Sequence, residues 1–422
     1  TFHKWKETPV NERAGLLRAA AEELRRQKSE FARLITLEMG KLLTEAEAEV
    51  EKSARVCDYY AEHGESYLSE KHIPTEYDVS KVVYRPLGPV LAIMPWNFPF
   101  WQVFRFAAPN LMAGNTGILK HAGNVSGCSL AIASVFEKAG FPEGCFASVL
   151  LPGKETQPLI EDKRVAAVTL TGSTQAGKKV AEMAGCNLKK TVLELGGSDP
   201  YLILDDANIQ LAAEKCAAGR LLNAGQSCIG AKRFIVMQEV YDDFVNAFKE
   251  KLQAAKLGDP MDKNTTLAPL ATKLFRDDLH HQVKSSLTAG ATCITGGYIP
   301  DMEGAFYPAT ILTDVKPGMP AYEEELFGPV ASVFKVSSED EAVRIANDTV
   351  FGLGAAVFTQ NSKRAERIAS GKLNAGTVFI NDFVKSDPRL PFGGIKESGY
   401  GRELAIEGFR EFMNVKTVAG NY

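Results

Sequence analysis

The pattern of hydrophobic and polar positions changes character along the chain. Between residues 10 and 68, apolar side chains such as Leu17 and Leu24 recur at helical spacing among Arg, Lys and Glu. From about Tyr77 to Tyr84, valines at closer spacing predict extended structure, which Pro and Gly residues then end. The sequence therefore predicts a helical start followed by a strand.

Beyond residue 88, short apolar runs alternate with helix-like stretches. The expected strands are 90–93, 116–119, 146–150, 165–171, 191–195, 233–237, 331–336 and 376–381, with helices at 211–222 and 241–256. Strand followed by helix, repeated, is typical of a parallel sheet covered on both faces. We therefore predict an α/β fold with two doubly wound parallel-sheet lobes, which meet near Gly196 and Gly197.

Composition narrows the class of protein. The 422 residues suggest two or three domains, and 45% of them are hydrophobic and 24% charged, as in ordinary globular proteins. A net charge of -4 argues against nucleic acid as a main partner, because phosphate binding needs a basic excess. No apolar run reaches the ~20 residues that a membrane helix needs, so we expect no membrane partner.

The seven cysteines are scattered and form no CxxC pair. This favours reduced thiols in a cytoplasmic compartment over a disulfide framework. No recognisable targeting segment opens the chain, and Thr1 lies within a helix-like pattern, so we expect further residues to precede it.

A glycine-bearing turn follows the strand that ends at Thr171. Gly172 and Ser173 open a helix, whose N-terminus could bind a phosphate. The string nearly spells a P-loop, but Lys179 stands where Mg²⁺ binding needs Ser or Thr. A simple strand-to-helix turn is the structural alternative.

Two residues are candidates for covalent chemistry. Cys228 has a polar, glycine-rich setting that suits a nucleophile, although a free Cys is often only a small buried hydrophobe. Glu194 ends an apolar strand, where burial raises the pKa of a carboxyl and suits a general base. A salt-bridged structural Glu is the alternative.

Asn97 lies between two prolines that restrict its backbone. Its amide could stabilise an oxyanion, or it could cap its own turn. The six His are dispersed without metal-site spacing, so we expect no metal.

Six ordered strings resemble the aldehyde dehydrogenase superfamily. They are PWNFP (95–99), LTGS (170–173), ELGGSDP (194–200), GQSC (225–228), EELFGPV (324–330) and PFGGIKESGYGRE (391–403). The resemblance covers essentially the whole chain and is closest to the NAD(P)-dependent succinate-semialdehyde dehydrogenases. It implies a cysteine thioester intermediate, with Cys228 as nucleophile, Glu194 as base and Asn97 as oxyanion donor.

The resemblance also implies the cofactor site and the domains. Lys120 would bind the adenosine ribose, and Ser173 the pyrophosphate. The other implied cofactor residues are Ile93, Met94, Trp96, Gly123, Gly172, Gly177, Leu195, Gly196, Glu325 and Phe327. Residues 1–66 with 88–196 would form the cofactor-binding domain, 197–400 the catalytic domain, and 67–87 with 401–422 a small β-element that joins a homodimer or a dimer of dimers.

Two positions depart from the family pattern. Gly123 stands where many NAD-specific members have Glu, so use of NADP as well as NAD is expected. Arg105 and Ser386 match carboxylate anchors of the succinate-semialdehyde enzymes, but Leu222 replaces a second Arg. Arg105 could alternatively be a surface or interlobe ion pair.

Three function hypotheses follow. The first is oxidation of an aldehyde, namely succinate semialdehyde, to the carboxylic acid with NAD(P)+, with a general dehydrogenase of short- and medium-chain aldehydes as its alternative. The second is a cofactor-free cysteine hydrolase or acyltransferase, which would leave Glu325, Phe327 and the Gly172 turn without a role. The third is a protein without catalysis, which would have no reason to keep Cys228, Glu194 and Asn97 together.

Overall fold

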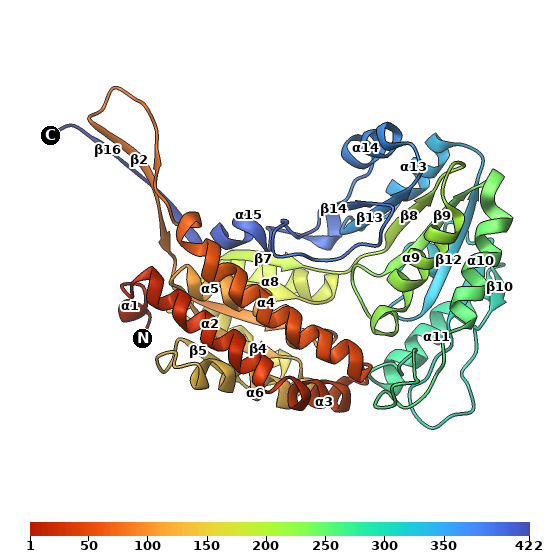
Figure 1. The fold of residues 1–422 in the computed structure, drawn as a ribbon, viewed down its shortest axis with the longest axis horizontal. Helices are drawn as coiled ribbons and strands as arrows, with labels where there is room; N and C mark the ends of the chain where they lie inside the picture. The colour runs from red at the N-terminus through yellow and green to blue at the C-terminus, as the bar shows by residue number, and fades with distance from the viewer.

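The computed structural model describes all residues from 1 to 422 as a mixed α/β fold with three sheets (Figure 1). The first sheet has the order β15-β7-β6-β3-β4-β5, and all its strands run parallel except β15. Its strands are β3 (Pro89–Met94), β4 (Thr116–His121), β5 (Phe146–Val149), β6 (Ala167–Thr171), β7 (Lys190–Glu194) and β15 (Gly399–Tyr400). The strand order reverses between β3 and β6, and ligands bind at the carboxyl ends of strands at such a point.

Helices pack their apolar faces around this sheet. They are α1 (Phe2–Trp5), α2 (Val10–Arg26), α3 (Lys28–Met39), α4 (Leu43–Tyr67), α5 (Trp101–Met112), α6 (Ser126–Lys138), α7 (Gln157–Glu161), α8 (Thr174–Cys186) and α15 (Ala405–Arg410), with short 3₁₀ turns η1 (Gly123–Val125) and η2 (Gly153–Glu155). The predicted periodicity is confirmed in α2, where Leu17 and Leu24 are fully buried. Helix α4 packs on α2, α3 and α5, and its residues on that side are buried.

The second sheet has the order β10-β11-β12-β9-β8-β13-β14 and is parallel except for β10. Its strands are β8 (Asp199–Ile203), β9 (Ala231–Met237), β10 (Thr292–Thr295), β11 (Thr310–Thr313), β12 (Val330–Val336), β13 (Gly354–Phe358) and β14 (Thr377–Ile380). The surrounding helices are α9 (Ile209–Leu221), α10 (Tyr241–Gln253), α11 (Lys273–Thr288), α12 (Pro320–Glu323), α13 (Glu339–Asn347) and α14 (Ser362–Gly371), with η3 (Leu222–Gly225), η4 (Gln238–Val240) and η5 (Lys396–Ser398). Two parallel-sheet lobes, as predicted, are thus confirmed.

A third, antiparallel sheet forms an arm that projects from the first lobe (Figure 1). It consists of β1 (Lys71–His72), β2 (Val79–Pro86) and β16 (Met413–Gly420). Strand β16 pairs with β2 along its whole length, which brings the C-terminal segment beside residues far from it in sequence. The other edge of β16 has no partner strand.

Some elements differ from the sequence prediction. Strand β8 is an inner strand of the second sheet, between β9 and β13, and the sequence did not predict it because its second residue is Pro200, and proline argues against an inner strand. The register of β8 against β9 shifts between Asp199 and Pro200, where the proline has no N–H to donate. The segment Gly399–Tyr400, expected within the catalytic part, pairs with β7 of the first sheet.

No helix in the structure combines the length and hydropathy needed to cross a membrane.

Candidate active site

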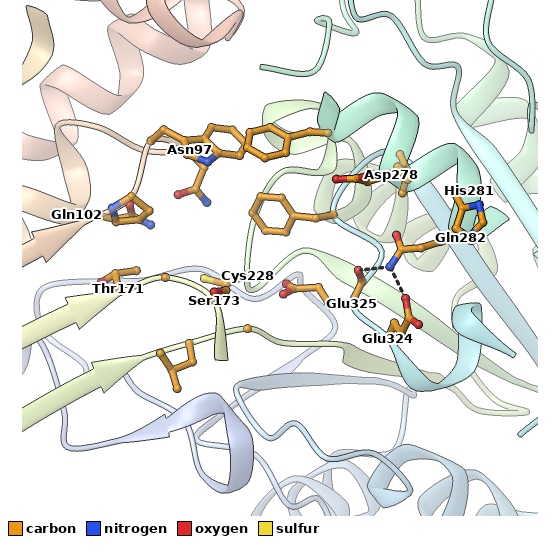
Figure 2. Close-up of a pocket in the computed structure, with 18 residues that line it drawn as sticks. Asn97, Gln102, Thr171, Ser173, Cys228, Asp278, His281, Gln282, Glu324 and Glu325 are labelled. Atoms are coloured by element: carbon orange, nitrogen blue, oxygen red, sulfur yellow. Dashed lines mark hydrogen bonds between the residues drawn. The ribbon is translucent and has the colours of Figure 1, made fainter. Parts of the chain in front are cut away.

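Cys228 lies where two cavities meet. A cavity of about 520 Å³ opens at the carboxyl ends of β3 and β6, and a second one of about 240 Å³ lies on the other side. Cys228 and Gln102 line both cavities. In Figure 2 the Cys228 sulfur and the Asn97 amide point into the larger cavity. A group held at Cys228 can therefore contact ligands from both sides.

The loop before Cys228 has an unusual backbone. Asn223, Ala224 and Gly225 all have positive φ, at 54°, 51° and 75°. Non-glycine residues rarely adopt this conformation, and strain of this kind occurs at functional sites. At Gly225 a Cβ would lie 2.3 Å from the Gly328 carbonyl oxygen, so only glycine fits. The backbone of this loop thus adopts φ angles that Asn and Ala residues disfavour on their own, so contacts with the rest of the protein must hold it in place.

Lys232 connects the Cys228 loop with the opposite wall. Its ammonium donates to the carbonyl oxygens of Ser227 and Cys228, each at 2.9 Å, and lies 3.0 Å from Glu325 Oε1. Burial raises the pKa of the Cys228 thiol to about 12, although Arg105 and Lys232 act in the opposite direction. Attack by the thiolate therefore calls for a group that accepts the thiol proton.

Asn97 is held by the same loop. Its Nδ2 donates to the Gln226 backbone carbonyl oxygen at 3.0 Å, and the backbone carbonyl oxygen of Asn97 accepts from Asn223 Nδ2 at 2.8 Å. Only 4% of Asn97 is exposed, and it lines the larger cavity. Because Nδ2 carries two N–H groups, one remains available to donate to a ligand oxygen near Cys228.

Glu194 ends β7 and is fully enclosed, 1% exposed, with no hydrogen-bond partner for either carboxylate oxygen. Burial raises the pKa of its carboxyl well above the usual value, and the neighbouring Glu403 raises it further. Arg105 forms an ion pair with Glu403. Glu194 does not line either cavity, so acting at Cys228 requires its side chain to turn toward the larger one.

The larger cavity collects many of the residues expected to bind a cofactor. Gly172, Ser173, Leu195, Gly196, Trp96, Glu325 and Phe327 all line it. Trp96 stacks on Phe275 with ring centroids 4.9 Å apart and meets Phe327 edge-on at 5.9 Å. The cavity therefore has a glycine-lined turn on one side and an aromatic wall on another (Figure 2).

The Gly172 turn precedes the N-terminus of α8. Ser173 is its N-cap, and its hydroxyl accepts from the Ala176 N–H at 3.3 Å. At Gly177 a Cβ would lie 2.5 Å from Leu195 Cδ2, so glycine allows α8 to approach the chain that leaves β7. These contacts fit the binding of a dinucleotide phosphate at a helix N-terminus.

The remaining predicted cofactor residues lie along the same sheet edge, outside the larger cavity. Ile93 and Met94 end β3, and Lys120 pairs in register with Ile93 on β4. Burial lowers the pKa of the Lys120 ammonium. Gly123 follows in η1, with open space where a side chain would begin.

The smaller cavity contains both predicted substrate residues. Arg105 and Ser386 line it together with Cys228, and Leu222 occupies its wall. Arg105 is only 3% exposed, and its Nη2 donates to Thr171 Oγ1 at 3.3 Å in addition to the ion pair with Glu403. From the sequence, Arg105 could either bind a substrate carboxylate or form a structural ion pair. In the structure it lines the smaller cavity and also forms an ion pair with Glu403.

Sequence reasoning missed several side chains of the site. Gln102, Thr171, Phe275, Asp278 and Gln282 line the larger cavity, and Lys52 and Trp101 line the smaller one. Gln282 Nε2 donates to Glu324 Oε2 at 2.7 Å and to the Glu325 carbonyl oxygen at 3.3 Å (Figure 2). Most of these residues lie on helices, where their spacing is that of ordinary amphipathic segments. Glu403 ends the last of the six strings, but nothing in the local sequence indicates its pairing with Arg105.

The fold and the site define a class: a two-lobed α/β enzyme with a cysteine between a sheet-edge crevice and a smaller second cavity. The model of the aldehyde dehydrogenase family matches residues 1–418. The chain therefore belongs to the aldehyde dehydrogenase family, and the resemblance drawn from the six strings is confirmed.

Relatives cover nearly the whole chain. A probable succinate-semialdehyde dehydrogenase (NADP(+)) of Synechocystis sp. is 50% identical over 418 residues, covering 99% of this chain and 92% of the relative. A succinate semialdehyde dehydrogenase (NAD(P)+) of Escherichia coli K12 is 46% identical, covering 99% of this chain and 90% of the relative. The crystal structure of the succinic semialdehyde dehydrogenase of Streptococcus pyogenes with NADP+ is 41% identical, with a TM-score of 0.97, covering 99% of this chain and 92% of that one.

Proposed function

We propose that this protein oxidises succinate semialdehyde to succinate with NAD(P)+, through a thioester on Cys228. The observation that carries the proposal is the smaller cavity, which has Cys228 in its wall together with the carboxylate-binding candidates Arg105 and Ser386. Relatives named for this activity, up to 50% identical, support it. The cavity is smaller than the ~300–1,000 Å³ typical of drug-sized ligands, which favours a short aldehyde.

The residues of the site have complementary roles in this reaction. The Cys228 thiolate attacks the aldehyde carbon, while an Asn97 N–H and the Cys228 backbone N–H donate to the oxygen that becomes negative. A bound nicotinamide cofactor supplies the hydride acceptor for the oxidation. Cys228 then holds the acyl group as a thioester. Glu194 takes a proton from the water that hydrolyses it, which releases the acid and restores the thiol.

The cofactor site proposed here spans the larger cavity and the nearby sheet edge. Ser173 and the N-terminus of α8 would hold the pyrophosphate, and Glu325 and Phe327 the nicotinamide half. Lys120 would hold the adenosine ribose, with Gly123 leaving room for a 2′-phosphate. We propose use of both NADP and NAD on this basis, and relatives named for NADP(+) and NAD(P)+ support it.

A panel of aldehydes assayed with each cofactor tests the proposal. We expect reduced cofactor to form with succinate semialdehyde, at a kcat/KM at least about tenfold above that for butanal, because a bound carboxylate adds a charge-assisted hydrogen bond. Equal kcat/KM values for both would instead support a general short- to medium-chain aldehyde dehydrogenase, an alternative that Leu222 in the cavity wall favours. Acyl transfer without cofactor reduction would contradict both.

Replacing Gly123 with glutamate is expected to shift preference toward NAD. The added carboxylate can accept from ribose hydroxyls and repels a 2′-phosphate, by roughly 1 kcal/mol or more at intermediate dielectric. No atom lies within 4 Å of a Cβ at this position, so the change should not disturb the fold. The ratio of kcat/KM for NADP to that for NAD should fall at least about fivefold. Gly123→Gln is the uncharged control, and an unchanged ratio in the Glu variant would place the ribose elsewhere.

We further propose that the arm joins copies of this chain in a homodimer or a dimer of dimers. The open edge of β16 supports this, because unpaired strand edges are sites of association. Val415 on this strand is 60% exposed, which adds apolar surface.

We propose three domains. The bridging element would comprise residues 67–87 and 401–422, the cofactor-binding domain residues 1–66 and 88–196, and the catalytic domain residues 197–400. A cytoplasmic setting is proposed from the seven cysteines, none of which is paired.

A further inference from the structure

The smaller cavity contains a cation that no sequence motif indicated. Lys52 lies on α4, is partly buried, and lines the cavity with Cys228. Its Nζ donates to Ser386 Oγ at 2.8 Å and lies 4.0 Å from the centroid of the Trp101 ring. No carboxylate is within ion-pair distance of Lys52, although a buried ammonium usually has such a partner.

The other cations of the cavity wall are already paired. Arg105 forms its ion pair with Glu403, and Lys385 lies 2.6 Å from Asp382 Oδ2. Of the acidic residues in the wall, Glu49 pairs with Lys41 and accepts from the Phe100 and Trp101 backbone N–H groups. Lys52 is therefore the cation of this wall that has no carboxylate within ion-pair distance.

Ser386 is arranged to act with Lys52. Its Oγ accepts from Lys52 Nζ and from Trp101 Nε1, at 2.8 and 3.0 Å. Both acceptor positions are thus used, and the hydroxyl hydrogen remains free to donate. Lys52 has three N–H groups, of which one serves Ser386 and one faces Trp101. One donor on each residue is left for an anion in the cavity.

We propose that Lys52 binds the distal carboxylate of the semialdehyde, together with Ser386, and supplies the positive charge that Leu222 cannot. This inference rests on the proposed function, since it names the group that recognises its substrate. Leu222 lines the same cavity, and the apolar side chain there provides no alternative donor. Arg105 contributes a positive potential but is already paired with Glu403.

The charge of Lys52 should depend on pH. Burial lowers the pKa of its ammonium to about 7, Arg105 and Arg55 act in the same direction, and Glu49 and Asp387 oppose them. Burial also raises the pKa of Glu45, another carboxyl of the cavity wall, so it adds less negative charge. Lys52 is protonated below its pKa and neutral above it, so carboxylate binding should weaken as pH rises through that value.

Substituting Lys52 by methionine tests the assignment, because methionine keeps an unbranched chain without the charge. The measured quantity is the ratio of kcat/KM for succinate semialdehyde to that for butanal. It should fall about tenfold, mainly through KM, as expected for the loss of one hydrogen bond to a charged group. Lys372→Met is the control, since it removes a lysine that is paired with Glu339 outside both cavities and should leave the ratio unchanged.

The pH profile of this ratio gives a second measurement that does not depend on the folding of a variant. Between about pH 6 and pH 9 it should fall in the wild type, whereas Lys52→Arg, which stays charged, should keep it nearly constant. A wild-type ratio near one throughout would overturn both the inference and the proposed substrate. A high ratio that survives in Lys52→Met, or that is independent of pH in the wild type, would overturn only the role of Lys52.

Discussion

Replacing Cys228 with alanine is expected to abolish aldehyde oxidation, with kcat falling by at least about 10³-fold. The reason is that Cys228 is the only thiol lining the two cavities, and alanine offers no nucleophile in its place. Cofactor binding should persist, because the proposed contacts come from other residues of the larger cavity. Steady-state rates and a fluorescence titration with reduced cofactor measure the two effects separately.

The control is Cys186→Ala, which removes an exposed cysteine at the end of α8 and should leave the activity unchanged. Alkylation provides an independent check. Because the pKa of Cys228 is raised to about 12, its thiolate fraction and its labelling rate should increase with pH across the neutral range. Inactivation that accompanies a label on Cys186 alone would contradict the assignment of Cys228.

Replacing Glu194 with glutamine should leave a burst of reduced cofactor followed by very slow turnover. An amide cannot accept a proton from water, so thioester hydrolysis should slow by about 10²–10⁴-fold, more than the steps before it. Glutamine has nearly the same shape and is neutral, which suits an enclosed position with no partner for either carboxylate oxygen. Stopped-flow absorbance of the reduced cofactor distinguishes the burst from the later turnover.

The surface variant Glu397→Gln serves as the control, because Glu397 forms an exposed ion pair with Lys178. In the wild type, the hydrolysis step should accelerate as pH rises, since the base acts only when ionised and burial raises the pKa of Glu194. If the burst and the turnover of Glu194→Gln decrease by the same factor, Glu194 is not a base specific to hydrolysis.

The local sequence predicted functional segments where one short string contains both the residues that shape the backbone and the residues that could act on a ligand. The PWNFP string and the turn at Gly172 follow strands β3 and β6, and both lie at the point where the strand order reverses. The alternation of apolar runs with helical stretches was sufficient to predict two parallel-sheet lobes. It was not sufficient for β8, where Pro200 masks an inner strand.

The sequence by itself thus determined the family, the α/β class and the residues Cys228, Glu194 and Asn97 as candidates, because each lies in a contiguous string with a recognisable local context. Only the tertiary structure brought Lys52 from α4 to Ser386, and Arg105 from α5 to Glu403. Such pairs join segments far apart in the chain, and an isolated Lys on a helix or an isolated Glu outside one looks like any solvated residue. Burial then decides their properties: it lowers the pKa of Lys52 and raises that of Glu194, and burial arises only when the elements pack together.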